Sequence, residues 1–280
     1  MKRGLYSYVA FVAILLVAGC DSNIVEIPEV KSSILVSHET FDNKTIIGEL
    51  ESDKTRKIYW NNGDDLVVNS VVSQPLTGIG ERCSKAEFWF RGLLSLPYNI
   101  VYPASIYKNE TTITLPYIRQ SGTAESLNAP MYGYADDLSS ITLKHLCAIL
   151  KFTIYGKIYD DHNTDHAIYY VMVRTPDSKQ LSGDFAIDYK QGTLRGLSST
   201  TNNTKAIVMV NEKSSVEEAI EVYVVVPAGV YESGFSLWIV DEKNHAMKKS
   251  AKAQELKAGE IKAMPPIEFE PTDTVADSEI

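Results

Sequence analysis

The chain has 280 residues, of which 44% are hydrophobic, and a formal net charge of −9 from 36 acidic and 27 basic residues. This apolar content is enough for a packed core, so the composition excludes a disordered chain. The acidic balance is the opposite of the clustered lysines and arginines that bind nucleic acid, so nucleic acid is excluded as the expected partner.

The first twenty residues have the pattern of a secretory signal. Lys2 and Arg3 form a basic start, and an apolar stretch follows from Leu5 to Ala18. This stretch is shorter than the roughly 20 apolar residues of a membrane-spanning helix. It ends in the letters VAGC, which resemble the bacterial lipobox, whose cysteine receives lipid and starts the mature chain. We therefore expect residues 1–19 to be a lipoprotein signal peptide and Cys20 to be lipidated; an ordinary secretory signal with an incidental cysteine is the alternative.

A lipid on Cys20 predicts the outer membrane as a partner, because each buried CH₂ group contributes about 0.8 kcal/mol to membrane binding. Loss of residues 1–19 removes two basic and no acidic residues, which changes the net charge from −9 to −11. Residues 20–53 are mostly polar around the short apolar stretch SILVS. We interpret this segment as a lipidated tether with one early strand.

Alternation with a period of two dominates the rest of the chain and predicts an all-β fold. In LCAILKFTI, residues 146–154, the side chains of Leu146, Leu150 and Phe152 share one face of a strand. Similar patterns recur between Pro, Gly, Asp and Asn. They are DDLVVNSVVS, AEFWFRG, YNIVYPA, TTITLPYIRQ, AIYYVMVRT, EVYVVVPAG and FSLWIVDE. Strands should stop or lie at a sheet edge at Pro103 and Pro227, because proline donates no ladder N–H.

About a dozen short strands are too many for one seven-stranded sandwich. The polar stretch YGKIYDDHNTDHAIYY separates two strand-rich halves. We therefore expect two tandem β-sandwich domains, at residues 54–159 and 160–270, and an acidic tail at 271–280 that frays. Tyr59 and Trp60 should pack at the edge of a sandwich.

Seven blocks in this order resemble fimbrillin-like lipoproteins, the type V pilin and cell-adhesion family of Gram-negative anaerobes. The blocks, which lie between Lys54 and Phe269, are KTRKIYWNNGDDLVV, YNIVYPASIY, ITLPYIRQ, LKHLCAILKFTI, LSGDFAIDY, VVVPAGVYESGFSLWIVD and LKAGEIKAMPPIEF. The resemblance implies transthyretin-like sandwiches and surface display on the outer membrane. It also implies a non-catalytic role, in cell adhesion or as an accessory, anchor or tip subunit of a pilus or fimbria.

In polymerising members of that family, a protease cuts after an arginine and releases an N-terminal strand, and a strand from a neighbouring subunit fills the groove. Arg56 is the candidate cleavage site here, and the released segment would contain Ile34 and Val36. The alternative is that Arg56 is a solvated residue before a strand. The tail at 271–280 is too acidic to donate such a strand, because burying unpaired carboxylates costs several kcal/mol each. We therefore do not expect a main shaft subunit.

No arrangement of residues predicts catalysis, a cofactor or a metal. Asp161, Asn163 and Asp165 match the opening of a calcium loop, but the turn-forming Gly and the closing Glu are absent. His145 and Cys147 share one side of an apolar strand, which favours a buried pair over a thiol nucleophile. Nucleophile-elbow and phosphate-binding glycine motifs are also absent from the sequence.

A candidate aromatic contact, Trp89, supplies the alternative function, that of an outer-membrane glycan-binding lipoprotein. Alternation in AEFWFRG places Trp89 on the face opposite Phe88 and Phe90. One of these faces belongs to the core, and a ring on the other face can stack on a sugar; packing within the sheet is the other interpretation of Trp89. Whether Cys83 pairs with Cys147 stays open.

Overall fold

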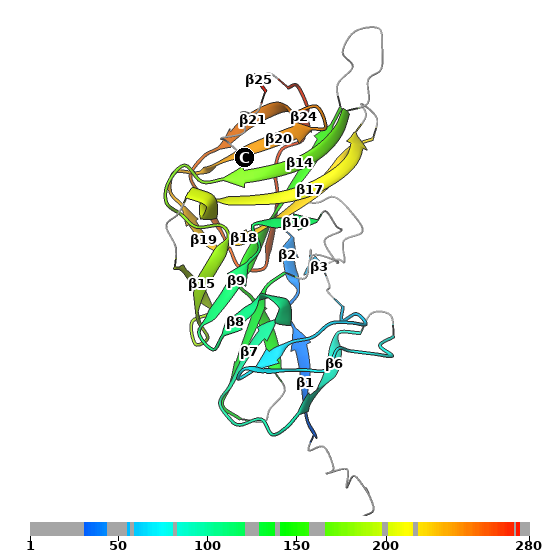
Figure 1. The fold of residues 1–280 in the computed structure, drawn as a ribbon, viewed down its shortest axis with the longest axis vertical. Coiled ribbons are helices and arrows are strands. Elements are labelled where there is room, and N and C mark those ends of the chain that lie inside the picture. Colours follow the sequence, from blue (N-terminus) through cyan, green and yellow to red (C-terminus); the bar gives the residue numbers. More distant parts are fainter. Residues whose placement is uncertain are drawn as a thin grey trace, which may run out of the picture.

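The computed structural model describes residues 31–43, 55–56, 59–80, 83–120, 129–137, 141–156, 166–197, 201–214, 218–271 and 273–274. The described chain is built almost entirely from β-strands, which confirms the expected all-β class. The helical elements in this part of the chain are two short 3₁₀ turns, η1 (Ala104–Ile106) and η3 (Thr201–Thr204). Figure 1 shows an elongated molecule, with β1 (Lys31–His38) and β6 (Lys85–Arg91) at one end. At the other end lie β14 (His166–Arg174), β17 (Lys205–Ser214), β20 (Phe235–Asp241) and β21 (His245–Ala251).

The sheet at the N-terminal end has seven strands. Their order is β5 (Val71–Val72), β4 (Val67–Val68), β7 (Tyr98–Tyr102), β11 (Met131–Ala135), β12 (Ile141–His145), β1 (Lys31–His38) and β6 (Lys85–Arg91). The residues after β5 return to β6: Ser73 pairs with Phe90, and the Gln74 N–H donates to the Trp89 carbonyl at 2.7 Å. The two ends of the strand order therefore meet, and the sheet closes around a core that includes Phe88, Phe90 and Leu143.

Three sheets of four or more strands and one two-stranded sheet form the rest. One sheet contains β10 (Ile118–Gln120), β17 (Lys205–Ser214), β14 (His166–Arg174), β20 (Phe235–Asp241), β21 (His245–Ala251) and β25 (Asp273–Thr274). A second contains β18 (Ile220–Pro227), β13 (Cys147–Tyr155), β23 (Glu260–Ala263), β2 (Phe41–Asn43), β3 (Thr55–Arg56) and β24 (Ile267–Glu268). A third contains β16 (Thr193–Gly196), β15 (Gly183–Asp188), β9 (Thr112–Leu115) and β8 (Tyr107–Asn109). The two-stranded sheet pairs β19 (Gly229–Tyr231) with β22 (Gln254–Leu256).

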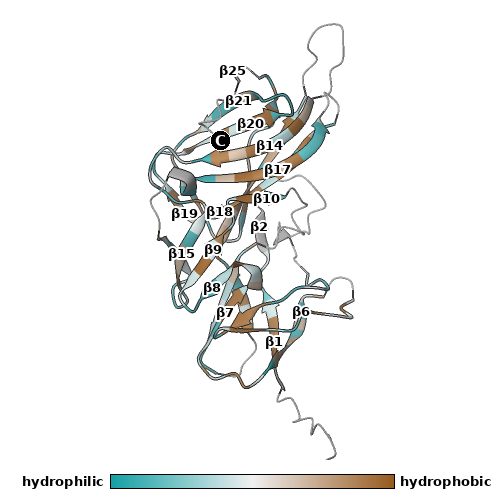
Figure 2. Cartoon of the chain, in the orientation of Figure 1, coloured by the Kyte–Doolittle hydropathy of each residue, from teal (hydrophilic) through white to brown (hydrophobic). Residues whose placement is uncertain are grey.

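β13 lies between two hydrophobic cores, and its alternating side chains serve both. Leu150 and Phe152 pack in one core, against β14, β17 and β20. Cys147 and Ile149 pack in the other, with residues of β9 and β15. Hydrophobic residues accordingly follow β9 and β14 in Figure 2. Lys151 is tolerated on this strand because its ammonium pairs with the Glu221 carboxylate.

Two expectations about strand ends are confirmed, and one about packing is wrong. β7 stops before Pro103 and β18 ends at Pro227, because proline supplies no ladder N–H. Trp60 was expected to pack at the sandwich edge. It is instead 2% exposed at the centre of the N-terminal core. The expected division between residues 54–159 and 160–270 stays a prediction; β13 of the first segment pairs along its length with β18 of the second.

Candidate functional site

The most distinctive feature of the N-terminal sheet is that β1, the first described strand, lies inside the sheet. β1 runs antiparallel to β6 over seven paired positions and parallel to β12 over three. The two neighbours, far downstream in the chain, leave between them a gap that β1 occupies, which we call the β1 slot. The early strand expected around SILVS is therefore confirmed, and it is an interior strand.

The side chains of β1 alternate between the core and the solvent. Ile34 and Val36 are buried, whereas Leu35 is 51% exposed. Burying two such aliphatic side chains contributes about 1.5–3 kcal/mol each, before the backbone ladder is counted. The strand is thus held by apolar burial on one face and by hydrogen bonds along both edges.

Trp60 forms the inner wall of the β1 slot. Its indole N–H donates to the Val36 carbonyl at 3.2 Å. Its ring makes edge contacts with His38, Phe88 and Tyr102, at centroid distances of 4.9, 5.0 and 5.2 Å. A buried indole needs a partner for its N–H, and here the partner is the backbone of β1, so the core and the strand depend on each other.

Glu39, the residue that follows β1, holds the C-terminal end of this strand in place. The Glu39 N–H donates to the Leu143 carbonyl at 2.8 Å, and the Glu39 carbonyl lies 3.2 Å from His145 Nε2. The His145 ring packs against Gly259, where an added Cβ would lie 2.9 Å from the ring. Burial lowers the pKa of His145 to about 4, and it also lowers the pKa of His38. Both imidazoles are therefore neutral at pH 7.

Arg56 lies in β3, which pairs with β2 at Phe41–Arg56 and Asp42–Thr55. β1 and β2 both precede this residue, so a cut after Arg56 would separate both strands covalently from the rest of the chain. Cys20 and the segment of Asp161, Asn163 and Asp165 lie outside the described residues.

Trp89 is exposed on the outer face of the N-terminal sheet, and Phe88 and Phe90 lie on the opposite face, as the alternation predicted for these three side chains. Trp89 is 43% exposed, while Phe88 and Phe90 are fully buried. Strand register places Ser33 of β1 beside Trp89 on one side, and Gln74 lies beside it on the other. Glu87 accepts a hydrogen bond from Ser33 Oγ at 2.7 Å on the same face. The indole is thus bordered by groups that donate and accept hydrogen bonds, and sequence reasoning missed Gln74 because it comes from a different segment.

The cysteine and histidine candidates form no reactive site in the described chain. Cys83 and Cys147 are unpaired. Burial raises the pKa of Cys147 to about 12, so the thiol that neighbours His145 in sequence stays protonated. Among the described residues, no group of three or more His, Cys, Asp or Glu side chains is placed to hold a metal ion, and no helix is long and apolar enough to span a membrane.

No family model matches the sequence, and no curated protein matches it. Several solved structures do resemble the chain. Two described as a "putative cell adhesion protein" come from Bacteroides ovatus (13% identity, TM-score 0.45, covering 82% of this chain and 89% of that one) and Bacteroides uniformis (11%, 0.44, 85% and 94%). A fimbrial protein from Bacteroides vulgatus has 7% identity and a TM-score of 0.34, covering 81% and 91%. These are the protein classes that the sequence resemblance names. At such values the likeness carries no conclusion about function, which we infer from the sequence and geometry of the chain itself.

Proposed function

We propose that the protein is a surface-exposed outer-membrane lipoprotein of the fimbrillin-like class. It acts in cell adhesion or as an accessory, anchor or tip subunit of a pilus, and it has no catalytic role. The observation that carries the proposal is the position of β1. A strand from the start of the described chain fills an interior slot of a sheet, upstream of the candidate cleavage site Arg56.

Strand addition supplies the mechanism of assembly. Once β1 leaves, the edges of β6 and β12 offer unpaired backbone groups, and the positions of Ile34 and Val36 become apolar pockets. A strand from another subunit gains affinity from the backbone hydrogen bonds and specificity from alternate side chains that enter those pockets. An interior slot with two edges binds such a strand more firmly than a single edge does.

Cleavage and assembly are tested together. Arginine-specific proteolysis of the purified chain should produce a new N-terminus at Lys57, and the cleaved subunits should associate with partner pilus subunits in electron micrographs. The Arg56→Ala variant is the matched control and should remain uncut and unassembled. Assembly of the uncut variant at the wild-type level would overturn the role given to Arg56.

The tail at residues 271–280 is not the donor in this proposal. Its apolar residues are few, and its carboxylates would be buried without partners in an apolar slot. Deletion of residues 271–280 should therefore leave assembly intact. Loss of polymer in that deletion would contradict the proposal.

The anchor is tested separately through Cys20. The Cys20→Ala variant should lose labelling by radioactive palmitate and should move from the detergent phase to the aqueous phase. Continued partition into detergent would contradict the lipid anchor.

A second candidate function, glycan binding, is favoured by one observation, the exposed Trp89 ring bordered by Ser33, Gln74 and Glu87. An aromatic face covers the apolar face of a sugar, and the adjacent polar groups orient its hydroxyls. Binding on a glycan array should disappear in Trp89→Ala and persist in Tyr169→Ala, whose ring is also 43% exposed but lies on β14. Equal binding by both variants would exclude Trp89 as the contact.

A further inference from the structure

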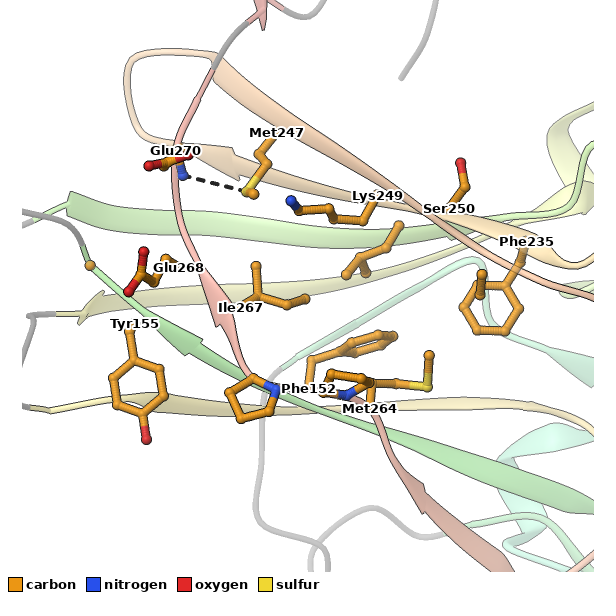
Figure 3. Close-up of a pocket in the computed structure, with 15 residues that line it drawn as sticks. Phe152, Tyr155, Phe235, Met247, Lys249, Ser250, Met264, Ile267, Glu268 and Glu270 are labelled. Atoms are coloured by element: carbon orange, nitrogen blue, oxygen red, sulfur yellow. Dashed lines mark hydrogen bonds between the residues drawn. The ribbon is translucent and has the colours of Figure 1, made fainter.

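A cavity of about 800 Å³ lies between β21 and β24, far along the chain from the β1 slot. Figure 3 shows β21 along one side, β24 on another and Phe152 at the base. Most of the lining side chains are apolar, and they include Phe152, Phe235, Leu237, Met247, Met264 and Ile267. The volume falls within the roughly 300–1,000 Å³ of ligand pockets. We call this cavity and its β21 border the edge groove.

The backbone of β21 borders the groove as an incompletely paired strand edge. β20 pairs with β21 from Ala246 to Ala251 on the inner side. On the outer side, the pairing among described strands is with β25, at His245 and Ala246. The next contact is different in kind, because the Glu270 N–H reaches Met247 Sδ (3.4 Å) and not a backbone carbonyl. Lys249, Ser250 and Ala251 of β21 line the groove, and alternate N–H and C=O groups of such an edge point away from the paired neighbour.

The opposite wall of the groove offers side chains and little backbone. It includes Pro265 and Pro266, which have no N–H to donate. β24 follows at Ile267, and its ladder is directed to β13. An extended chain that enters the groove therefore finds hydrogen-bonding partners on β21. On the other wall it finds the apolar side chains of Met264 and Ile267 and, beyond them, the carboxylates of Glu268 and Glu270.

Lys249 is the cationic side chain of the groove lining and belongs to the β21 wall, whereas the carboxylates of Glu268 and Glu270 belong to the opposite wall. Lys249 shares a strand face with Met247 and Ala251, lines the groove and extends along it in Figure 3. No carboxylate in the described part of the chain forms an ion pair with it. A lysine at an edge blocks unselective pairing of strands, while an acidic residue directly opposite on a partner strand forms a favourable cross-strand pair.

We propose that the edge groove binds an extended strand of a partner protein, which adds to β21 and places an acidic side chain opposite Lys249. Apolar side chains of that strand lie opposite Met247 and Ala251 and fill the cavity. The partner segment is thus a short strand with an apolar–acidic–apolar pattern on its inward face. This site uses residues that the β1 slot does not, so the proposal can be tested and can fail independently of the proposed function.

The test is a titration of the full mature chain with a synthetic peptide, followed by amide chemical shifts and hydrogen exchange. The probe is a seven-residue peptide whose three inward positions are valine, glutamate and valine and whose four outward positions are threonine. Shifts and added exchange protection should concentrate on residues 247–251. A peptide of the same composition without the alternation should produce neither.

Two controls distinguish a strand from other occupants. A probe with N-methylated amides keeps its side chains but cannot form a ladder, and it should bind at least about tenfold more weakly. Lys249→Glu should weaken the glutamate probe by about fivefold or more and strengthen a probe with lysine at that position, whereas Lys144→Glu, on the N-terminal sheet, should do neither. Equal binding of the N-methylated probe, or no response at residues 247–251 with millimolar probe, would overturn the proposal.

Discussion

The two ends of the molecule manage their strand edges in different ways. At the N-terminal end, the gap between β6 and β12 is filled by β1 of the same chain, and the sheet closes. At the other end, β21 is covered by β25 over two positions and then borders an open cavity. The inward residues of the filled slot, Ile34 and Val36, are apolar, whereas the open edge carries the inward-facing Lys249. A charge on an edge protects it from unselective pairing, and a filled slot needs no such protection.

The largest expected effect comes from placing a charge in the filled slot. Val36→Asp should reduce the free energy of unfolding by at least about 4 kcal/mol, because an unpaired carboxylate would be buried where Val36 is fully enclosed. Leu35→Asp, one residue earlier on the exposed face, should change it by less than about 1 kcal/mol. Chemical denaturation measures both. Similar losses in the two variants would mean that β1 does not occupy the slot.

Burial of His145 beside the C-terminal end of β1 should make the free energy of unfolding depend on pH. The folded pKa of about 4 lies below the ordinary value of 6.5, so the unfolded chain binds more protons between those values. Stability contributed by neutral His145 is therefore complete above about pH 6.5 and declines as the pH falls toward 4, by about 3 kcal/mol in total.

His145→Gln removes this titration, so the loss of stability between pH 7 and pH 4.5 should be smaller in the variant than in the wild type by a few kcal/mol. Denaturation curves at the two pH values provide the difference, in which the contributions of all other groups cancel. An unchanged difference would show that His145 is not held neutral by burial.

Methionine truncations compare a packed interior with the edge groove. Met172→Ala, at a fully buried position, should cost about 4 kcal/mol, while Met247→Ala, beside an existing cavity, should cost about 2 kcal/mol. The difference arises because Met247 already lacks neighbours on its groove side. Equal costs would indicate that the groove is filled in solution.

The smallest effect on stability is expected at the open edge itself. Lys249→Met should change the free energy of unfolding by less than about 0.5 kcal/mol, since the side chain is exposed and forms no ion pair among the described residues. It should, however, promote self-association through β21, because it removes the charge that protects this edge. Sedimentation velocity measures the association, and a monomer at all concentrations would argue against an accessible edge.

The strands themselves could be predicted from alternation, and so could the face of Trp89, because both depend on neighbours in the sequence. The ends of β7 and β18 followed from the missing N–H of Pro103 and Pro227. Pairing partners could not be predicted, because they come from distant segments. The alternation in LCAILKFTI placed Leu146, Leu150 and Phe152 on one face. The structure buries both faces of β13 in two separate cores, and Leu146, which precedes β13, packs in the core opposite that of Leu150 and Phe152.

The candidate sites show the same difference between features that local sequence predicts and features that depend on distant segments. The sequence predicted a strand that contains Ile34 and Val36 and precedes Arg56. The position of this strand between β6 and β12 could be known only from the structure. The contact of Trp60 with the Val36 carbonyl and the position of Gln74 beside Trp89 depend on loops whose course no local pattern specifies. The edge groove was missed for the same reason, since its walls combine β13, β20, β21 and the segment around Pro265.

Strand exchange tests the central claim most directly. A specific protease site is introduced between residues 44 and 54, so that the result does not depend on Arg56, and the cleaved protein is incubated with a labelled peptide of residues 31–40. The labelled peptide should replace the original fragment while the rest of the chain stays folded, and a peptide carrying Val36→Asp should not. Loss of the fragment without any change in stability, or failure of the labelled peptide to enter, would contradict a replaceable strand in the β1 slot.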